Sequence, residues 1–460
     1  MIDAMRIENV EIGGRAGQGL TILGGRIATL GREASRALPV LDGGGGALIP
    51  GLADHHLHLF ATAARAASID LTGADRAEVA RRIAGAPVAA GEWIRAVGYH
   101  EQGGGLLTRD ELDAMAPRNP LRVQHQTGEL WLLNSPALAL TTAHSLPPMV
   151  ECDRHGRPTG RIWRGDAWLG ERIGRVTPGF RAIGDKLSAF GVTAVTDASP
   201  TTDASGAAVL AEARRRGDLP QRLMLMSGGP LAAPVDGAFA VGPVKILLDD
   251  ERLPTLDELA ALIANAHDQD RGAAIHCVTE VQLAISLAAL DQAGCGPRDR
   301  IEHASLVPPS AIMEIRRLGV TVVTQPDFVR SRGDRYRDHV EREDQDNLYR
   351  LGSLEAAGVP VAASSDAPYG TLDPWASMRA AVYRKTARAE SLGAAEALSP
   401  ASAMRLFLGH AARPGHPRRI VAGAAADLCL LSRPMRDVLG HLDADLVAAT
   451  IVAGSVTYLQ

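Results

Sequence analysis

Two histidines separated by one residue are the first feature of this sequence that could carry out chemistry. His56 and His58 lie near the end of an apolar run that begins at Ala47. Side chains at positions i and i+2 of a β-strand point to the same side, so both imidazoles could reach one metal ion. His55 would point to the other side, and we interpret it as a supporting or structural residue. An HxH pair is also common in polar loops, so this pair needs further ligands before it indicates a metal site.

A lysine in an apolar run is the second feature. The chain has only three lysines, Lys186, Lys245 and Lys385, and its other basic residues are arginines. Lys245 lies in the run Val244 to Leu248, where its stem could pack while its ammonium group pairs with an acid. A desolvated lysine can instead lose its charge and add CO2, and the resulting carbamate can bridge two metal ions. Arginine cannot do this, so we favour the functional interpretation.

Three more residues of metal-binding type follow β-like runs. His276 and His303 each end such a run, and Asp366 follows another. A lone histidine in such a place is more often a core residue, and Asp366 could cap a turn. Imidazole nitrogens and a carboxylate together suit Zn, Fe, Ni or Co. Asp366 would also be placed to accept the proton of a metal-bound water, which makes it the candidate catalytic residue.

The order of apolar runs predicts the elements that would bring these residues together. Eight β-rich runs alternate with helical patterns such as 256–267 and 281–293, which predicts an α/β fold, a (β/α)8 TIM barrel. A doubly wound sheet gives similar runs. In a barrel, reactive groups gather at the carboxyl ends of the strands. The eight runs are 47–59, 191–197, 221–226, 244–249, 272–278, 300–305, 319–325 and 358–366.

The remaining segments predict accessory structure. Residues 1–50 and 407–460 contain short strand-like runs, which we expect to pair into one composite β-sandwich. The barrel would then occupy residues 51–406. The gap between its first two strands is too long for one helix, so we expect an inserted subdomain after strand 1, at about 62–188.

Composition limits the classes of partner. Of the 460 residues, 46% are hydrophobic and 22% charged, and the net charge is -5. No basic block and no long apolar segment occur, so we expect neither nucleic acid nor a membrane as a partner. The four cysteines lie far apart, which favours free thiols in a reducing compartment. With no leader-like segment at Met1, these features predict a cytoplasmic protein.

Several motifs together resemble the amidohydrolase superfamily, in particular its YtcJ-like branch (amidohydrolase family 3). Residues 47–59 are similar to the superfamily's Pro-Gly…Asp-x-His-x-His opening. Residues 134–138 and 156–160 resemble segments of the branch's insertion, 301–304 its sixth strand and 365–368 its eighth. The resemblance covers nearly the whole chain, and it rests on the order and spacing of the motifs.

The resemblance implies a binuclear metal centre and a reaction. His56 and His58 would hold the buried ion with Asp366, His276 and His303 would hold the exposed ion, and a carboxylated Lys245 would bridge them. We expect two zinc ions, with Fe, Mn, Co or Ni as alternatives. The implied activity is hydrolysis of a carbon–nitrogen bond other than a peptide bond, in a small molecule. The family's habits also suggest a homodimer.

Two departures from the branch bear on the substrate. Glu129 stands where relatives usually carry histidine, and Glu280 ends a segment where relatives often show His-Ala-x-Gly-Asp. Both changes are expected near the substrate, so the substrate of a relative is not transferable. Our candidate substrate contacts are His125, Arg122, Glu129, Trp163, Glu280 and Arg384.

Two other functions stay open. A mononuclear deaminase of an amino-heterocycle would usually carry a glutamate three residues after the fifth-strand histidine. Glu280 lies four residues after His276, and Lys245 would have no purpose in such an enzyme. A non-catalytic binding protein on a degenerate barrel is the second alternative, and the complete set of candidate ligands argues against it.

Overall fold

The computed structural model describes residues 4–31, 38–101, 105–141, 146–174 and 177–460. The chain forms two compact units. The first contains Met1–Leu59 and Phe180–Gln460, and the second contains Phe60–Gly179. Each unit is described by itself below.

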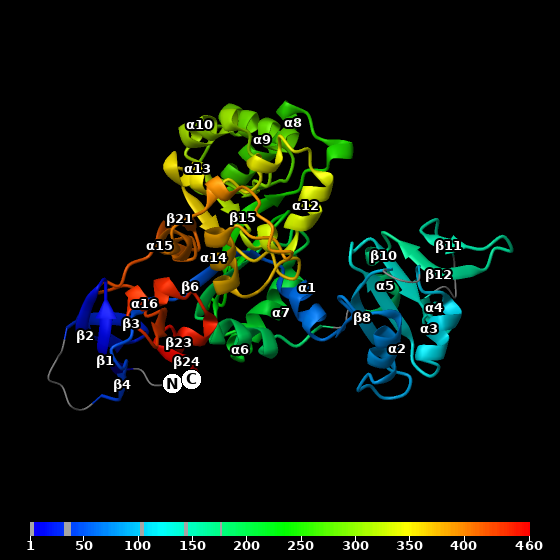
Figure 1. The fold of residues 1–460 in the computed structure, drawn as a ribbon, viewed down its shortest axis with the longest axis horizontal. Helices are drawn as coiled ribbons and strands as arrows, with labels where there is room; N and C mark the ends of the chain where they lie inside the picture. The colour runs from blue at the N-terminus through cyan, green and yellow to red at the C-terminus, as the bar shows by residue number, and fades with distance from the viewer. Residues whose placement is uncertain (1–3, 32–37, 102–104, 142–145, 175–176) are drawn as a thin grey trace. The chain divides into compact units, whose positions relative to one another are not determined.

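An eight-stranded parallel sheet forms the centre of the first unit (Figure 1). Its strands are buried on both faces, as expected for a parallel sheet covered by helices; β13, for example, is buried at every residue. In sheet order the strands are β19 (Val361–Ala363), β18 (Thr321–Thr324), β17 (Arg300–His303), β16 (Ala273–Cys277), β15 (Ala240–Ile246), β14 (Arg222–Ser227), β13 (Val192–Asp197) and β6 (Leu52–Leu57).

Backbone hydrogen bonds join the two outer strands of this sheet. The amide of Asp366 donates to the His56 carbonyl at 2.8 Å, and the amide of His58 donates to the Ala367 carbonyl at 2.8 Å. At the other end, Ala53 and Ala363 donate to the carbonyls of Phe407 and Leu406. The sheet therefore closes on itself, and the predicted (β/α)8 barrel is confirmed.

Helices connect most of the strands. The capping box of α8, in which Thr255 and Glu258 cap each other's backbone, fixes its start. The connection 228–239 between β14 and β15 contains no helix. The helices of the first unit are α6 (Arg181–Ala189), α7 (Ala204–Arg215), α8 (Leu256–Asp268), α9 (Glu280–Ala293), α10 (Pro309–Leu318), α11 (Asp327–Ser331), α12 (Gly333–His339), α13 (Leu351–Ala356), α14 (Pro374–Tyr383), α15 (Pro400–Arg405) and α16 (Met435–Gly440). Helix α1 (Leu59–Ala66) begins at the last residue of the first unit and otherwise belongs to the second. No helix of the described residues is long and apolar enough to cross a membrane.

Two predicted strands have different limits in the structure. The run 47–59 is divided at Gly51 into β5 (Leu48–Pro50), which joins another sheet, and β6. A Cβ at Gly51 would lie 2.1 Å from the Thr193 side chain, so glycine permits this close passage. The run 244–249 also differs, because β15 begins at Ala240 and ends at Ile246. Pro243 interrupts its apolar pattern, which obscured the true start.

Both chain ends contribute to a pair of four-stranded sheets. The first has the order β3 (Arg26–Leu30), β2 (Arg15–Leu23), β1 (Ala4–Ile12) and β4 (Val40–Asp42). The second has the order β24 (Ser455–Leu459), β23 (Val447–Val452), β22 (Leu428–Leu431) and β5. Buried residues of both sheets share one core, in which Ile7 and Leu20 lie with Leu430 and Ile451. Between the barrel and these strands, β20 (Gly409–His410) pairs with β21 (Arg413–Pro417).

The second unit, residues 60–179, contains a six-stranded sheet with a core on each face. One core packs against α2 (Arg76–Ala84) and α3 (Arg109–Met115), and the other against α4 (Ser135–Thr141) and α5 (Asp166–Ile173). Helix α6, which our predicted insertion included, lies in the first unit. The strands in sheet order are β11 (Val150–Cys152), β12 (Pro158–Trp163), β10 (Leu130–Leu133), β9 (Leu121–His125), β8 (Ile94–Tyr99) and β7 (Ile69–Asp70).

Candidate metal centre

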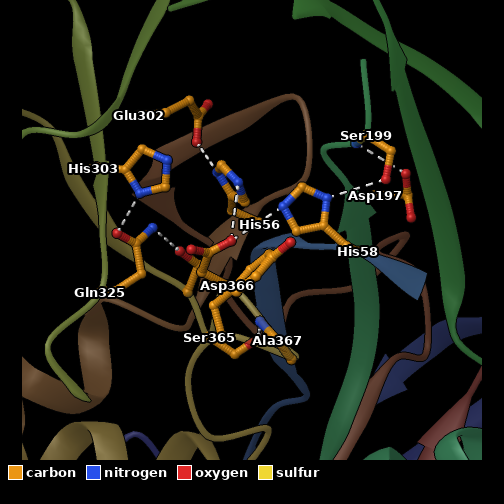
Figure 2. A network of polar contacts seen from close by, with 12 residues as sticks. His56, His58, Asp197, Ser199, Glu302, His303, Gln325, Ser365, Asp366 and Ala367 are labelled. Atoms are coloured by element: carbon orange, nitrogen blue, oxygen red, sulfur yellow. Dashed lines mark hydrogen bonds and ion pairs between the residues drawn. The ribbon is translucent and has the colours of Figure 1, made fainter. Parts of the chain in front are cut away.

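Three side chains from the first and last barrel strands form a compact group of possible metal ligands. Nitrogen atoms of His56 and His58 and an oxygen of Asp366 lie within 4.8 Å of one another. Asp366 Oδ1 is 3.2 Å from His58 Nε2 and 3.5 Å from His56 Nε2. Figure 2 shows both imidazoles turned toward this carboxylate. The closing hydrogen bonds between His56, His58 and the loop after β19 hold the three residues in register.

The other candidate ligands surround this group. The His303 ring centroid lies 4.9 Å from that of His56, and the His276 centroid lies 4.5 Å from that of His303. Lys245 is 4% exposed, and its Nζ has no hydrogen-bond partner among the described residues. Its ammonium group interacts electrostatically with Asp366 and with Glu302. The structure therefore brings all six candidate ligands to the carboxyl end of the barrel.

Two of these residues have a left-handed backbone. His303 has φ 69° and Asp366 has φ 51°, a region that non-glycine residues seldom adopt and that often accompanies functional sites. Regular alternation would place Glu302 and His303 on opposite faces of β17. The turn at His303 ends that alternation, and both side chains approach His56.

A buried carboxylate orients His56. Glu302 accepts a hydrogen bond from His56 Nδ1, which leaves Nε2 directed toward Asp366. Arg300 donates to the other oxygen of Glu302 and, through Nη2, to the His55 carbonyl at 2.6 Å. Such carboxylate support of a histidine fixes its tautomer and raises its basicity as a metal ligand.

Polar neighbours also orient the other imidazoles (Figure 2). His303 Nδ1 donates to Gln325 Oε1 at 2.8 Å, and Gln325 in turn donates to Ser364 Oγ at 3.0 Å. His58 Nδ1 lies 3.1 Å from Ser199 Oγ. Asp197 accepts hydrogen bonds from the amides of Ser199 and Leu59, so it joins the end of β13 to the end of β6.

Burial sets the protonation states that ligation requires. It lowers the pKa of His56 and His303 well below the ordinary imidazole value, and that of His276 to about 4. Burial also lowers the pKa of Lys245. For Asp366, burial raises the pKa, but the hydrogen bond with His58 and electrostatic interactions with neighbouring side chains outweigh it, so the pKa of this carboxyl group is lowered. Neutral imidazoles beside an ionised carboxylate are the states in which these groups bind metal.

The donor set fits divalent metal ions. Imidazole nitrogens with one carboxylate suit zinc and its neighbours in the transition series. The unpartnered Nζ of Lys245 adds a buried amine among the imidazoles, where a carbamate would supply two more oxygens.

Four of the predicted substrate contacts lie in the inserted unit. His125, at the end of β9, contacts Glu101 through Nε2 at 2.6 Å. Glu129 pairs with Arg164 at 3.3 Å, and Trp163 donates to Glu151 at 3.4 Å. The Arg122 guanidinium is 5.3 Å from the centre of the Trp131 ring and 5.9 Å from that of Trp93.

The other two predicted contacts lie in the barrel unit. Glu280 is exposed in the first turn of α9. Arg384 is fully buried, and its guanidinium donates to the carbonyls of Tyr349, Leu348, Leu392 and Gly393. These bonds occupy the group, so Arg384 is a structural residue that is not available to a substrate.

Sequence reasoning missed the residues that orient the ligands. Glu302 stands directly before His303, and strict alternation along β17 would direct its side chain away from the site. Asp54 was treated only as part of a motif, yet its buried carboxylate accepts hydrogen bonds from the amides of His56 and Ser365. Gln325 follows β18 and Ser199 follows β13. Their positions after the carboxyl ends of barrel strands could have indicated that both lie near the site.

Comparisons with known proteins show the family and the fold of the chain. The sequence model of the amidohydrolase family matches residues 39–458. The N-substituted formamide deformylase of Arthrobacter pascens is 27% identical over 100% of this chain and 98% of its own length. The protein YtcJ of Bacillus subtilis is 23% identical, over 90% of this chain and 89% of its own length.

A solved structure has the same fold. It is a metal-dependent hydrolase of Pyrococcus horikoshii, of uncharacterised activity, and it superimposes with a TM-score of 0.80. The alignment covers 96% of this chain and 100% of that protein at 20% identity.

Proposed function

The chain belongs to the amidohydrolase family, and we propose that it hydrolyses a non-peptide carbon–nitrogen bond of a small molecule at a binuclear metal centre. The proposal depends on one observation above all. Lys245 is buried and interacts electrostatically with His56, His276, His303 and Asp366, yet its Nζ has no hydrogen-bond partner in the described part of the chain. Two buried carboxylates, Glu302 and Asp366, interact electrostatically with this amine, but no hydrogen bond from the described residues holds its Nζ.

We propose that His56, His58 and Asp366 hold one ion, that His276 and His303 hold the second, and that carboxylated Lys245 bridges them. Bound divalent ions would lower the pKa of water toward neutrality and polarise a carbonyl oxygen. Zinc is the first expectation for the ions, since its preferred ligands are those present.

The proton transfers would fall to Asp366. Its Oδ1 lies between the two Nε2 atoms of His56 and His58, so it can accept a proton from the attacking water. The same carboxyl group can then give that proton to the departing nitrogen. Glu302 and Ser199 keep the two imidazoles directed toward it.

The relative from Arthrobacter pascens suggests the first substrate class to test. It is named for its action on N-substituted formamides. We therefore propose amides of small carboxylic acids, beginning with N-substituted formamides, and ureides as the next compounds to examine.

The test is metal content by elemental analysis, with protein purified without chelators. Wild type should contain about two equivalents of metal per chain, as two-metal hydrolases do. Lys245→Ala should contain one or none. Lys385→Ala is the matched control, because Lys385 is exposed and donates to Ser391; it should match wild type. A carbamate carbon signal, detected by NMR after growth with 13C-bicarbonate, should disappear only in Lys245→Ala.

Formate release from N-substituted formamides tests the activity separately.

The metal analysis also distinguishes the alternatives. About one equivalent of metal, unchanged by Lys245→Ala, would contradict the binuclear site and favour a mononuclear deaminase that acts on amino-heterocycles. Metal-free protein without any hydrolytic activity would favour a binding protein.

A further inference from the structure

A cavity near the amino ends of the barrel strands has no part in the proposed reaction. Its volume is about 600 Å³. Its walls include Ala194 of β13 and Arg222, the first residue of β14, which are paired in the sheet. The candidate metal ligands lie at or beyond the opposite ends of the strands. The cavity also borders β22 and residues 417–425, so it lies where the barrel meets the sandwich.

The charges in this cavity are unbalanced. Arg222, Arg418 and Arg419 line it, and Asp427 is the one carboxylate among the lining residues. Arg222 donates to Asp427, which is 6% exposed and also accepts from the Ala453 amide at 2.8 Å. Three guanidinium groups against one carboxylate leave two positive charges uncompensated within the cavity wall.

Arg418 is held in place by backbone carbonyls. It donates to the Gly51 carbonyl through Nη2 and to the Leu408 carbonyl through Nε at 3.4 Å. Burial lowers the pKa of Arg418. The charge of Asp427 raises this pKa, and the charge of Arg222 lowers it. Burial likewise lowers the pKa of His410 in the same wall, with Arg418 as the next cause. Burial is the largest cause of both shifts, so it is the excess of arginine charge among the lining residues that makes this cavity an environment for an anion.

Much of the remaining wall is apolar. Ile27, Ile420, Val421 and Leu428 line the cavity. Ile27 and Leu428 are each 1% exposed, so the apolar surface that is open to water comes from Ile420 and Val421. If an inorganic ion bound in the cavity, this apolar surface would stay exposed to water. A ligand with an apolar body would cover it, at about 25 cal/mol for each Å² removed from water.

We propose that this cavity is a binding site for a small organic carboxylate. The carboxylate lies against the exposed guanidinium group of Arg419, whose planar shape suits its two oxygens. Arg418, which donates to the Gly51 and Leu408 carbonyls, contributes its charge. The apolar body packs against Ile420 and Val421. Arg222 stays paired with Asp427 and contributes its charge. Because the site is remote from the metal centre, ligand binding there stabilises the fold and does not compete with substrate.

Calorimetric titration of the metal-loaded protein with 2-naphthoate tests the proposal. Wild type should bind it with a Kd of about 1 mM or tighter, the affinity expected of a fragment-sized ligand. The melting temperature should rise with ligand concentration. Neutral 2-naphthol should bind at least tenfold more weakly, and sulfate should give no comparable stabilisation.

Arg419→Gln is the decisive variant, since this exposed residue makes no contact on which the fold depends in the described part of the chain. We expect its Kd for 2-naphthoate to rise at least tenfold, while its metal content and melting temperature without ligand stay unchanged. Arg436→Gln is the matched control, because Arg436 is 86% exposed and lies outside the cavity; it should bind like wild type.

Binding at the metal centre gives a different pattern. There, 2-naphthoate would inhibit hydrolysis competitively, and Arg419→Gln would bind it as well as wild type. That result, or equal affinity for 2-naphthoate and 2-naphthol, would overturn the proposal. The titration does not depend on the enzymatic activity, so it can succeed or fail independently of the proposed function.

Discussion

The two ends of the barrel hold their polar groups in different ways. At the carboxyl end, imidazoles, a carboxylate and a lysine are buried, and supporting side chains such as Glu302 and Gln325 orient the imidazoles. At the amino end, arginines pair with Asp427 or donate to backbone carbonyls. Groups that bind metal or exchange protons are thus concentrated at one end, and groups of permanent charge at the other. This agrees with the general division of barrels into a reactive face and a stabilising face.

The difference predicts which property each end controls. At the carboxyl end, burial lowers the pKa of the imidazoles His56, His276 and His303 and of the Lys245 amine, although the Glu302 and Asp366 carboxylates oppose it, and a lowered pKa favours metal binding and proton transfer. Guanidinium groups do not titrate in the physiological range, so the amino end can contribute to stability and anion binding only. Substitutions at the two ends should therefore affect different measurements.

The largest effect is expected for Asp366→Asn. Asparagine tolerates the left-handed backbone of this position, so the loop after β19 should keep its conformation. Loss of the proton-accepting carboxylate should lower kcat by about 10³-fold, in the range measured for general acid–base groups. Steady-state kinetics with elemental analysis checks this. Metal should be retained at half the wild-type content or more; turnover near that of wild type would contradict the role assigned to Asp366.

A smaller effect on the same end is expected for Glu302→Gln. The amide cannot hold the His56 tautomer as firmly, and Arg300 loses its buried counter-charge. Metal affinity should fall roughly 10–100-fold, as for other partners that orient histidine ligands. Competition with a chromophoric chelator measures it.

Glu251→Gln is the control for this substitution, because Glu251 is exposed in the connection between β15 and α8. It should leave metal affinity unchanged. If Glu302→Gln also kept full metal affinity, the contact with His56 would be structural only. The carboxyl end would then not depend on a supporting carboxylate for metal binding.

Much of the fold could be predicted from the sequence, because a parallel strand that is buried on both faces consists of a continuous run of apolar residues. Each of the eight runs overlaps a strand of the barrel, and the helices predicted at 256–267 and 281–293 correspond to α8 and α9. Errors arose where one residue decided the geometry. Gly51 divides an apolar run between two sheets, and Pro243 stands inside β15 where it obscured the strand's beginning.

The candidate site was predictable where alternation and strand order decide which residues meet. His56, His58, His276 and Lys245 lie in or directly after regular strands, and the structure brings them together. The contribution of Glu302 depends on the left-handed turn at His303, which no sequence pattern indicates. Arg384 was predicted near the substrate, but its contacts with four carbonyls depend on the path of loops far apart in sequence.

The smallest effect is expected at the amino end, for Asp427→Asn. The amide oxygen can still accept from the Ala453 amide, but the charge that faces Arg222 is lost. We expect a stability loss of about 1–2 kcal/mol, as for removal of one buried charged hydrogen bond. A lower melting temperature at unchanged metal content and kcat would sharpen the contrast between the ends. Asp270→Asn, in an ion pair whose aspartate side chain is 94% exposed, should change nothing measurable. A loss of kcat in Asp427→Asn would mean that the amino end is coupled to the metal centre, and the separation of roles would then fail.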